Sequence, residues 1–169
     1  MLLQGSCHRG AVSFSVNSRG PRPYQRCYCT ICPKAGGAGG FAINLLADNE
    51  STKITGQEHV AVYRALNNGD PSKHYRSFCW NCGSYLWAWN ENWPGLVHPL
   101  ASVIDTPLPK PAHFVDMMSD RAAPWVELHV GDHIERCPEY LPQSIEAWHR
   151  SRGLWLDECL DDHVDYTGR

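Results

Sequence analysis

The chain has 169 residues and a formal net charge of -3 at pH 7, with 43% hydrophobic and 20% charged residues. This length predicts a single folded chain with a core of its own, and the composition is that of an ordinary globular protein. The scattered Lys and Arg residues offer no basic surface for nucleic acid or an anionic membrane, and no apolar run reaches the roughly 18 residues of a membrane helix.

The chain begins with short strands separated by turns. Alternating apolar and polar residues, bounded by Gly, Pro, Asn and Asp, are typical of half-buried strands. We expect strands at residues 11–16, 25–29, 41–46, 52–56, 60–65, 73–78, 85–89, 96–103, 112–117 and 125–130. Residues 17–24, 36–40 and 67–71 are expected to be loops or turns.

The pattern changes after Pro138. A helix is expected to begin near Leu141–Ser144 and to end at Gly153, with Ile145, Trp148 and Arg152 on one face. We therefore expect a mainly β fold with a short C-terminal helix. Residues 1–136 would form the metal-binding domain, and residues 137–169 an extension that packs on it.

Three cysteines, Cys27, Cys29 and Cys32, form a C-x-C-x-x-C pattern. A second pair, Cys79 and Cys82, lies downstream, and Cys7 lies upstream. A C-x-x-C pair on a tight turn can point both sulfurs at one ion, and two residues at i and i+2 of a strand share a face. The spacing predicts zinc binding. Three protein ligands with an open fourth position are typical of a catalytic site, and four of a structural site.

Other uses of these cysteines stay open on the sequence alone. A disulfide framework usually accompanies small secreted chains. Residues 1–10 contain no basic region followed by an apolar stretch, so we expect no secretory signal and a cytoplasmic protein. A thioredoxin-type redox pair would need a βαβ pattern, which is absent around Cys29 and Cys32. Buried free thiols are a third alternative, but six cysteines are unlikely to fall into three such compact groups by chance.

The order of motifs is specific. The chain reads G-S-C-x-x-G-A-V-x-F, C-x-C-x-x-C, F-C-x-x-C-G-S and then D-x-P…H-F-V-D…P-W. It resembles the family of glutathione-dependent formaldehyde-activating enzymes and centromere protein V, from about Gly5 to about Asp132. The resemblance implies a zinc-containing β-tent of the Mss4-like type with two zinc sites. Cys27, Cys29 and Cys32 would form the catalytic site.

The resemblance implies a second, structural site formed by Cys7, position 9, Cys79 and Cys82. Position 9 is Arg9 in this chain, and a guanidinium cannot ligate zinc. His8, Cys137 or another histidine could supply the missing ligand, or the site could be weakened or lost, which we favour. The family also commonly has His where this chain has Tyr28, which is not a ligand position.

By resemblance, the expected function is that of a zinc-dependent carbon–sulfur lyase acting on a glutathione adduct or another small thiol adduct. A non-catalytic, zinc-stabilised binding or scaffold protein is the alternative, and a purely structural zinc domain is a third possibility. The oligomeric state stays open, with a homodimer as one option. Catalytic candidates besides the three cysteines are Asp105 and His113 of the D-x-P…H motif.

Further candidates flank the first cysteine cluster. Each also has a plain structural reading, as solvated charge, flexible linker or core packing. Arg26 and Lys34 could receive substrate carboxylates, Gly37 and Gly39 could offer backbone amides, and Trp80, Tyr85, Trp87 and Trp89 could line a pocket.

Overall fold

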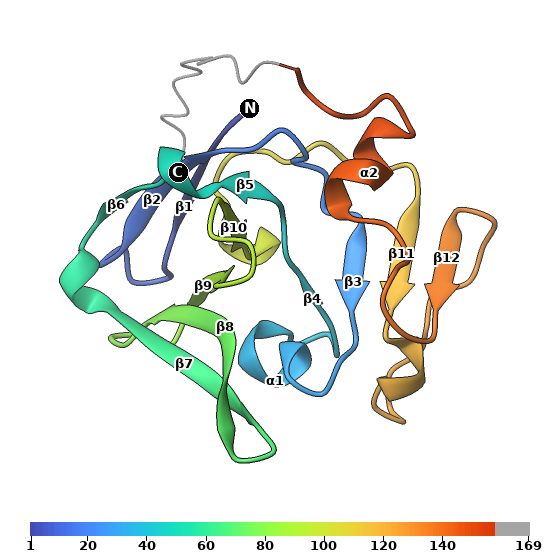
Figure 1. The fold of residues 1–169 in the computed structure, drawn as a ribbon, viewed down its shortest axis with the longest axis horizontal. Coiled ribbons are helices and arrows are strands. Elements are labelled where there is room, and N and C mark those ends of the chain that lie inside the picture. Colours follow the sequence, from blue (N-terminus) through green and yellow to red (C-terminus); the bar gives the residue numbers. More distant parts are fainter. Residues whose placement is uncertain (158–169) are drawn as a thin grey trace.

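The computed structural model describes residues 1–157 and shows a mainly β protein, as expected, with three sheets (Figure 1). The first sheet has the order β1-β2-β6 and consists of β1 (Leu2–Ser6), β2 (Ser13–Asn17) and β6 (Lys53–Thr55). The second has the order β5-β10-β9-β8-β7 and consists of β5 (Ala47–Asp48), β10 (Leu96–Pro99), β9 (Tyr85–Asn90), β8 (Asp70–Cys79) and β7 (Val60–Asn67).

The third sheet has the order β12-β11-β3-β4 and consists of β12 (Ile134–Cys137), β11 (Phe114–Met117), β3 (Gln25–Cys27) and β4 (Ala42–Ile43). The helices are α1 (Cys32–Gly36) and α2 (Ile145–Arg150), with 3-10 turns at Asn49–Ser51, Gln57–His59, Ala101–Val103 and Ser119–Arg121. Within residues 1–157, none of the helices has the length and apolar character needed to cross a bilayer.

The five-stranded sheet lies between two groups of buried side chains, each of which contains cysteines. Strand β9 contributes Leu86 and Trp87 to the group that contains Cys7 and Cys79. It contributes Tyr85 and Ala88 to the group that contains Cys27 and Cys32. Strict alternation would place the adjacent Leu86 and Trp87 on opposite faces. The register of β8 and β9 shifts between the Ser77–Trp87 and Phe78–Tyr85 pairs, and this irregularity lets β9 contribute neighbouring residues to one group and flanking residues to the other.

The hairpin of β7 and β8 extends away from the rest of the molecule (Figure 1). Its turn contains Asn68 at φ 52° and Gly69 at φ 94°, the pair of positive φ angles that a two-residue hairpin turn requires. The turn expected at residues 67–71 is confirmed there.

Strand β11 pairs in parallel with both β3 and β12, which places Asp116 beside Arg26 and Met117 beside Cys27. Helix α2 covers this region, because Trp148 stacks on Tyr24 with ring centroids 3.6 Å apart. The Ser144 hydroxyl caps α2 by accepting a hydrogen bond from the amide of Ala147. The expected helix is present, and the division of the chain at residue 137 stays a prediction.

The structure corrects several expected elements. Strands β1 and β12 and helix α1 were not expected, and the strand expected at 125–130 is irregular. In that segment Trp125 and Val130 are largely exposed. Val126 instead lies against Gly40, where an added Cβ would come within 2.3 Å of it. Apolar residues in this segment pack against a loop, which local alternation cannot distinguish from strand pairing.

Candidate metal centre

The first cysteine cluster forms where β3 meets α1 (Figure 1). Cys27 is the last residue of β3, and Cys32 is the first residue of α1, where Pro33 suits the start of a helix. The sulfurs of Cys27, Cys29 and Cys32 all lie within 4.8 Å of one another. Sulfurs around one tetrahedral zinc ion lie about 3.8 Å apart, so the residues present fit a single metal ion.

The cluster is arranged to hold negative charge on Cys29. The amide of Cys32 donates a hydrogen bond to the Cys29 sulfur at 3.3 Å. Hydrogen bonds from the Cys27 and Cys32 thiols lower the pKa of Cys29, whereas hydrogen bonding to Cys29 raises the pKa of Cys27. Cys27 and Cys32 are buried, and Cys29 is half-buried. The most thiolate-like sulfur is therefore also the one nearest solvent.

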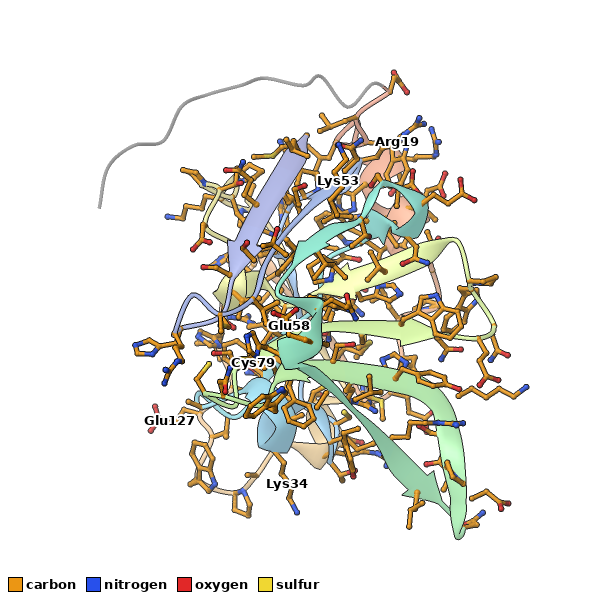
Figure 2. The ribbon with its side chains drawn as sticks, turned by 90° about the vertical axis from the view of Figure 1, so that its left-hand side faces the viewer. Arg19, Lys34, Lys53, Glu58, Cys79 and Glu127 are labelled. Carbon is orange, nitrogen blue, oxygen red and sulfur yellow. The ribbon has the colours of Figure 1, made fainter. Side chains whose placement is uncertain are left out.

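The second cluster joins two turns from distant parts of the chain. The sulfurs of Cys7, Cys79 and Cys82 also lie within 4.8 Å of one another. The amide of Val12 donates to the Cys7 sulfur at 3.3 Å, and the Ser84 hydroxyl lies 3.3 Å from the Cys82 sulfur. That hydroxyl is the main reason why the pKa of Cys82 falls to about 6. Figure 2 shows Cys79 in the interior, whereas Cys82 is exposed.

The missing family ligand of the second cluster is not replaced within residues 1–157. No fourth His, Cys, Asp or Glu of this part of the chain joins either cluster. His8 and Arg9 are exposed, and the amide of His8 donates to Ser84. Cys137 packs in a separate buried group with Tyr24. How strongly the second cluster binds metal stays a prediction.

Asp105 and His113 are not brought to the first cluster. The Asp105 carboxylate accepts a hydrogen bond from the Ser6 hydroxyl at 2.7 Å, beside β1. His113 precedes β11 and lines a polar hollow of about 220 Å³, together with residues of β12 and α2. It lies four residues from Met117, the neighbour of Cys27, which corresponds to about 13 Å of extended strand. Their catalytic roles stay predictions.

The flanking cations expected to bind carboxylates have different surroundings. Arg26 is 5% exposed, and its Nε atom lies 2.6 Å from a carboxylate oxygen of Asp116, so its charge is already paired. Lys34 is exposed on the outer side of α1 (Figure 2).

Tyr28, the neighbour of Cys27, is fully buried and lies against Phe41 with ring centroids 5.4 Å apart.

The glycine run closes the turn after α1. The amide of Gly37 donates to the carbonyl of Pro33 at 3.0 Å, and an added Cβ at Gly37 would lie 1.9 Å from the carbonyl oxygen of Phe41. Gly37 thus has a structural reason to lack a side chain. An added Cβ at Gly39 would only touch the Phe41 ring at 3.4 Å. A role of either glycine in substrate binding stays a prediction.

Of the four aromatic residues considered, Tyr85 alone is packed in the group that contains Cys27 and Cys32. Trp87 packs edge-on against Phe14 on the other side of the sheet. Trp89 donates from its indole nitrogen to the Pro94 carbonyl, and Trp80 is 58% exposed. They do not form a common pocket wall.

Arg76, which is 7% exposed on β8, was not among the residues expected at the site. The only signal was a charged residue in a strand leading into the second cysteine pair. A strand pattern does not say which charged residue is turned inward, because that depends on the neighbouring strand and on what covers it.

Comparison with known proteins agrees with this geometry. The family profile of glutathione-dependent formaldehyde-activating enzymes matches residues 2–122. A Halomonas elongata protein named "Putative glutathione-dependent formaldehyde-activating enzyme" is 46% identical over 155 residues, which are 91% of this chain and 98% of that protein. A crystal structure of a Rhodobacter sphaeroides protein has a similar fold, with a TM-score of 0.50 and 24% identity over 63% of this chain and 91% of that one. The mainly β fold and its two cysteine clusters fit the expected Mss4-like type. The chain belongs to the family of glutathione-dependent formaldehyde-activating enzymes.

Proposed function

We propose that the protein is a zinc-dependent carbon–sulfur lyase that acts on a glutathione–formaldehyde adduct at the first cysteine cluster. The observation that carries the proposal is the convergence of three sulfurs, from Cys27, Cys29 and Cys32, with no fourth ligand from residues 1–157. Three protein ligands are typical of catalytic zinc. The family profile and the Halomonas elongata relative support glutathione and formaldehyde as the reactants.

Zinc bound by the three cysteines would lower the pKa of a coordinated substrate thiol and so favour its thiolate at neutral pH. In the synthase direction, the glutathione sulfur bonds to the formaldehyde carbon, and the carbonyl oxygen takes up the proton that the thiol released. The lyase direction breaks the same carbon–sulfur bond and returns the proton to sulfur.

The chain's own residues hold and shield this site. The three cysteines would bind the metal as thiolates, and the amide of Cys32 stabilises charge on Cys29 through its 3.3 Å hydrogen bond. Ala42, Leu100, Met117 and Met118 pack around the cluster and limit the access of water to it. The half-buried Cys29 leaves one side of the cluster open, where a substrate sulfur would approach.

The decisive experiment compares Cys29→Ser with Cys137→Ser. Cys137 is also a buried cysteine, but it lies outside both clusters, so it controls for the loss of a thiol. We expect Cys29→Ser to lose one metal ion per chain and to lose exchange between formaldehyde and its glutathione adduct, measured by NMR. Cys137→Ser should keep both properties.

The cobalt-substituted protein tests the open position directly. We expect its visible absorption to change when glutathione is added, because a new sulfur would enter the coordination sphere. If the spectrum of the metal-loaded protein does not change when glutathione is added, the result would support a structural role for zinc instead. Full activity in Cys29→Ser would refute the catalytic assignment.

A further inference from the structure

Arg76 is a buried cation without a partner in the described part of the chain. Its side chain is 7% exposed, and its Nε and Nη1 atoms have no hydrogen-bond acceptor within residues 1–157. No ion pair joins it to a carboxylate of that part of the chain. Buried charges are normally paired, because losing water without a compensating partner is costly. The unused donors of Arg76 therefore point to an anion that comes from outside the chain.

Two other arginines on strands have a carboxylate within ion-pair distance, although the buried Nη2 atom of Arg26 also lacks a hydrogen-bond partner in the described residues. Arg26 is buried to a similar extent but lies 2.6 Å from Asp116. Arg64, on β7 beside the same hairpin, donates to the carbonyls of Ser72 and Pro71 and lies 3.8 Å from Glu91. Arg76 differs from both in having no carboxylate partner among residues 1–157.

Strand pairing turns Arg76 toward the first cysteine cluster. Arg76 on β8 is directly opposite Ala88 on β9, and residues in such a pair lie on the same face of a sheet. Ala88 packs in the group that contains Cys27 and Cys32.

The space beside the cluster contains a second unsatisfied polar group. The side-chain nitrogen of Asn44 lies 4.0 Å from the Cys32 sulfur, and its buried Oδ1 atom has no hydrogen-bond partner in the described residues. The Nε and Nη1 atoms of Arg76 make no hydrogen bond to the sulfurs of the cluster, although Arg76 and the cluster lie on the same side of the sheet. These two donor atoms are therefore available to a ligand.

We propose that Arg76 binds a carboxylate of the thiol substrate, while the substrate sulfur approaches the cluster of Cys27, Cys29 and Cys32. This inference rests on the proposed function and adds a specificity-determining residue to it. A guanidinium presents a planar set of donors that matches a carboxylate with two parallel hydrogen bonds, and it stays charged at any physiological pH. Glutathione carries two carboxylates, so the site would favour acidic thiols over neutral thiols of similar size.

The test compares glutathione with glutathione diethyl ester, which keeps the thiol and loses both negative charges. Binding of each ligand to the cobalt-loaded protein is measured by calorimetry and by the change in visible absorption. Hydrogen bonds to charged groups are worth about 1.5–3 kcal/mol, so we expect the wild type to bind glutathione about tenfold to a hundredfold more tightly than the ester.

Three variants assign that preference to Arg76. Arg76→Gln and Arg76→Met should bind the two ligands with nearly equal affinity and should leave the affinity for the ester unchanged. Arg64→Gln removes a neighbouring arginine that already has partners, and it should keep the wild-type preference. Metal content and circular dichroism are measured for every variant.

The outcomes separate this inference from the proposed function. If the wild type binds glutathione and its ester equally well, Arg76 does not bind a carboxylate, although the proposed function stands. If neither ligand binds the wild type, the proposed function fails. Loss of metal in Arg76→Gln would show that Arg76 balances the charge of the cluster, and failure of both neutral variants to fold would show a structural role. Either result would overturn the inference.

Discussion

Replacing Asp116 with Ala is expected to destabilise the protein strongly, because it would leave the buried guanidinium of Arg26 without its partner. The Arg26 and Asp116 side chains are 6% and 0% exposed, and the joining atoms lie 2.6 Å apart. Removing one member of a buried ion pair typically costs about 3–5 kcal/mol. The remaining neighbours of Arg26, the Phe114 and Phe41 rings at 4.7 and 5.9 Å, offer only weaker cation–π contacts.

The pair of Glu146 and Arg150 is a matched control. Its atoms are 2.7 Å apart, almost the same distance, but the side chains are 48% and 52% exposed. Solvent screens such a pair, and Glu146→Ala should cost about 0.5 kcal/mol or less. Comparing Asp116→Ala with Glu146→Ala by chemical denaturation therefore measures the effect of burial.

The same perturbation tests how the metal centre is supported. Asp116 is beside Arg26, and the next pair along the two strands is Met117 and Cys27. We expect Asp116→Ala to loosen this pairing and to release metal from the first cluster more readily to a chelator.

The double variant Arg26→Met with Asp116→Leu should recover most of the stability, because it removes both charges. A loss below about 1 kcal/mol in Asp116→Ala, the range of exposed pairs, would refute the reasoning.

Three other predictions concern single residues. Arg9→Cys should increase the metal bound per chain and slow its release to a chelator, because it adds a fourth sulfur to the second cluster. Gly37→Ala should destabilise the turn after α1 and weaken metal binding, because its Cβ would lie 1.9 Å from the Phe41 carbonyl oxygen, whereas Gly39→Ala should have little effect. His149 is fully buried, and burial lowers its pKa. Below its unfolded pKa of about 6.5 the unfolded state binds more protons, so stability should fall as pH drops below that value, and less so in His149→Gln.

Each of these predictions has a contrary outcome. Unchanged metal stoichiometry and release in Arg9→Cys would show that the second cluster is already complete. Equal stability of the two glycine variants by thermal unfolding would contradict the close contact at Gly37. A parallel fall of the denaturation midpoints of wild type and His149→Gln between pH 7.5 and 5.5 would show that other groups dominate the pH dependence.

Much of the fold was readable in local patterns. The hairpin turn at residues 67–71 and the C-terminal helix were predicted from residues whose backbone preferences are strong, such as Asn-Gly and a serine N-cap. Strands β1 and β12 were missed because only their pairing with β2 and β11 makes them strands. The expected strand at residues 125–130 was wrong, since its apolar residues cover a loop.

In the candidate site, too, some features were predicted from local sequence and others depend on the tertiary structure. Cysteine spacing alone predicted the first cluster and the Cys79–Cys82 pair of the second, because a C-x-x-C turn brings its own sulfurs together. That Cys7 meets Cys79 and Cys82 was implied by family resemblance and is shown by the structure. Proximity in the sequence did not predict which charged side chain is free to bind a ligand, because Arg26 flanks the first cluster but is paired with Asp116.

The sequence by itself predicted the candidate metal ligands, the mainly β character and the family, because thiol spacing and turn residues act over a few positions. Only the tertiary structure decided which side chains share a face with those thiols. That choice depends on strand register, where a shift by one residue would turn Arg76 to the opposite side of the sheet. Burial then decides which charges are paired and which remain available to bind a ligand.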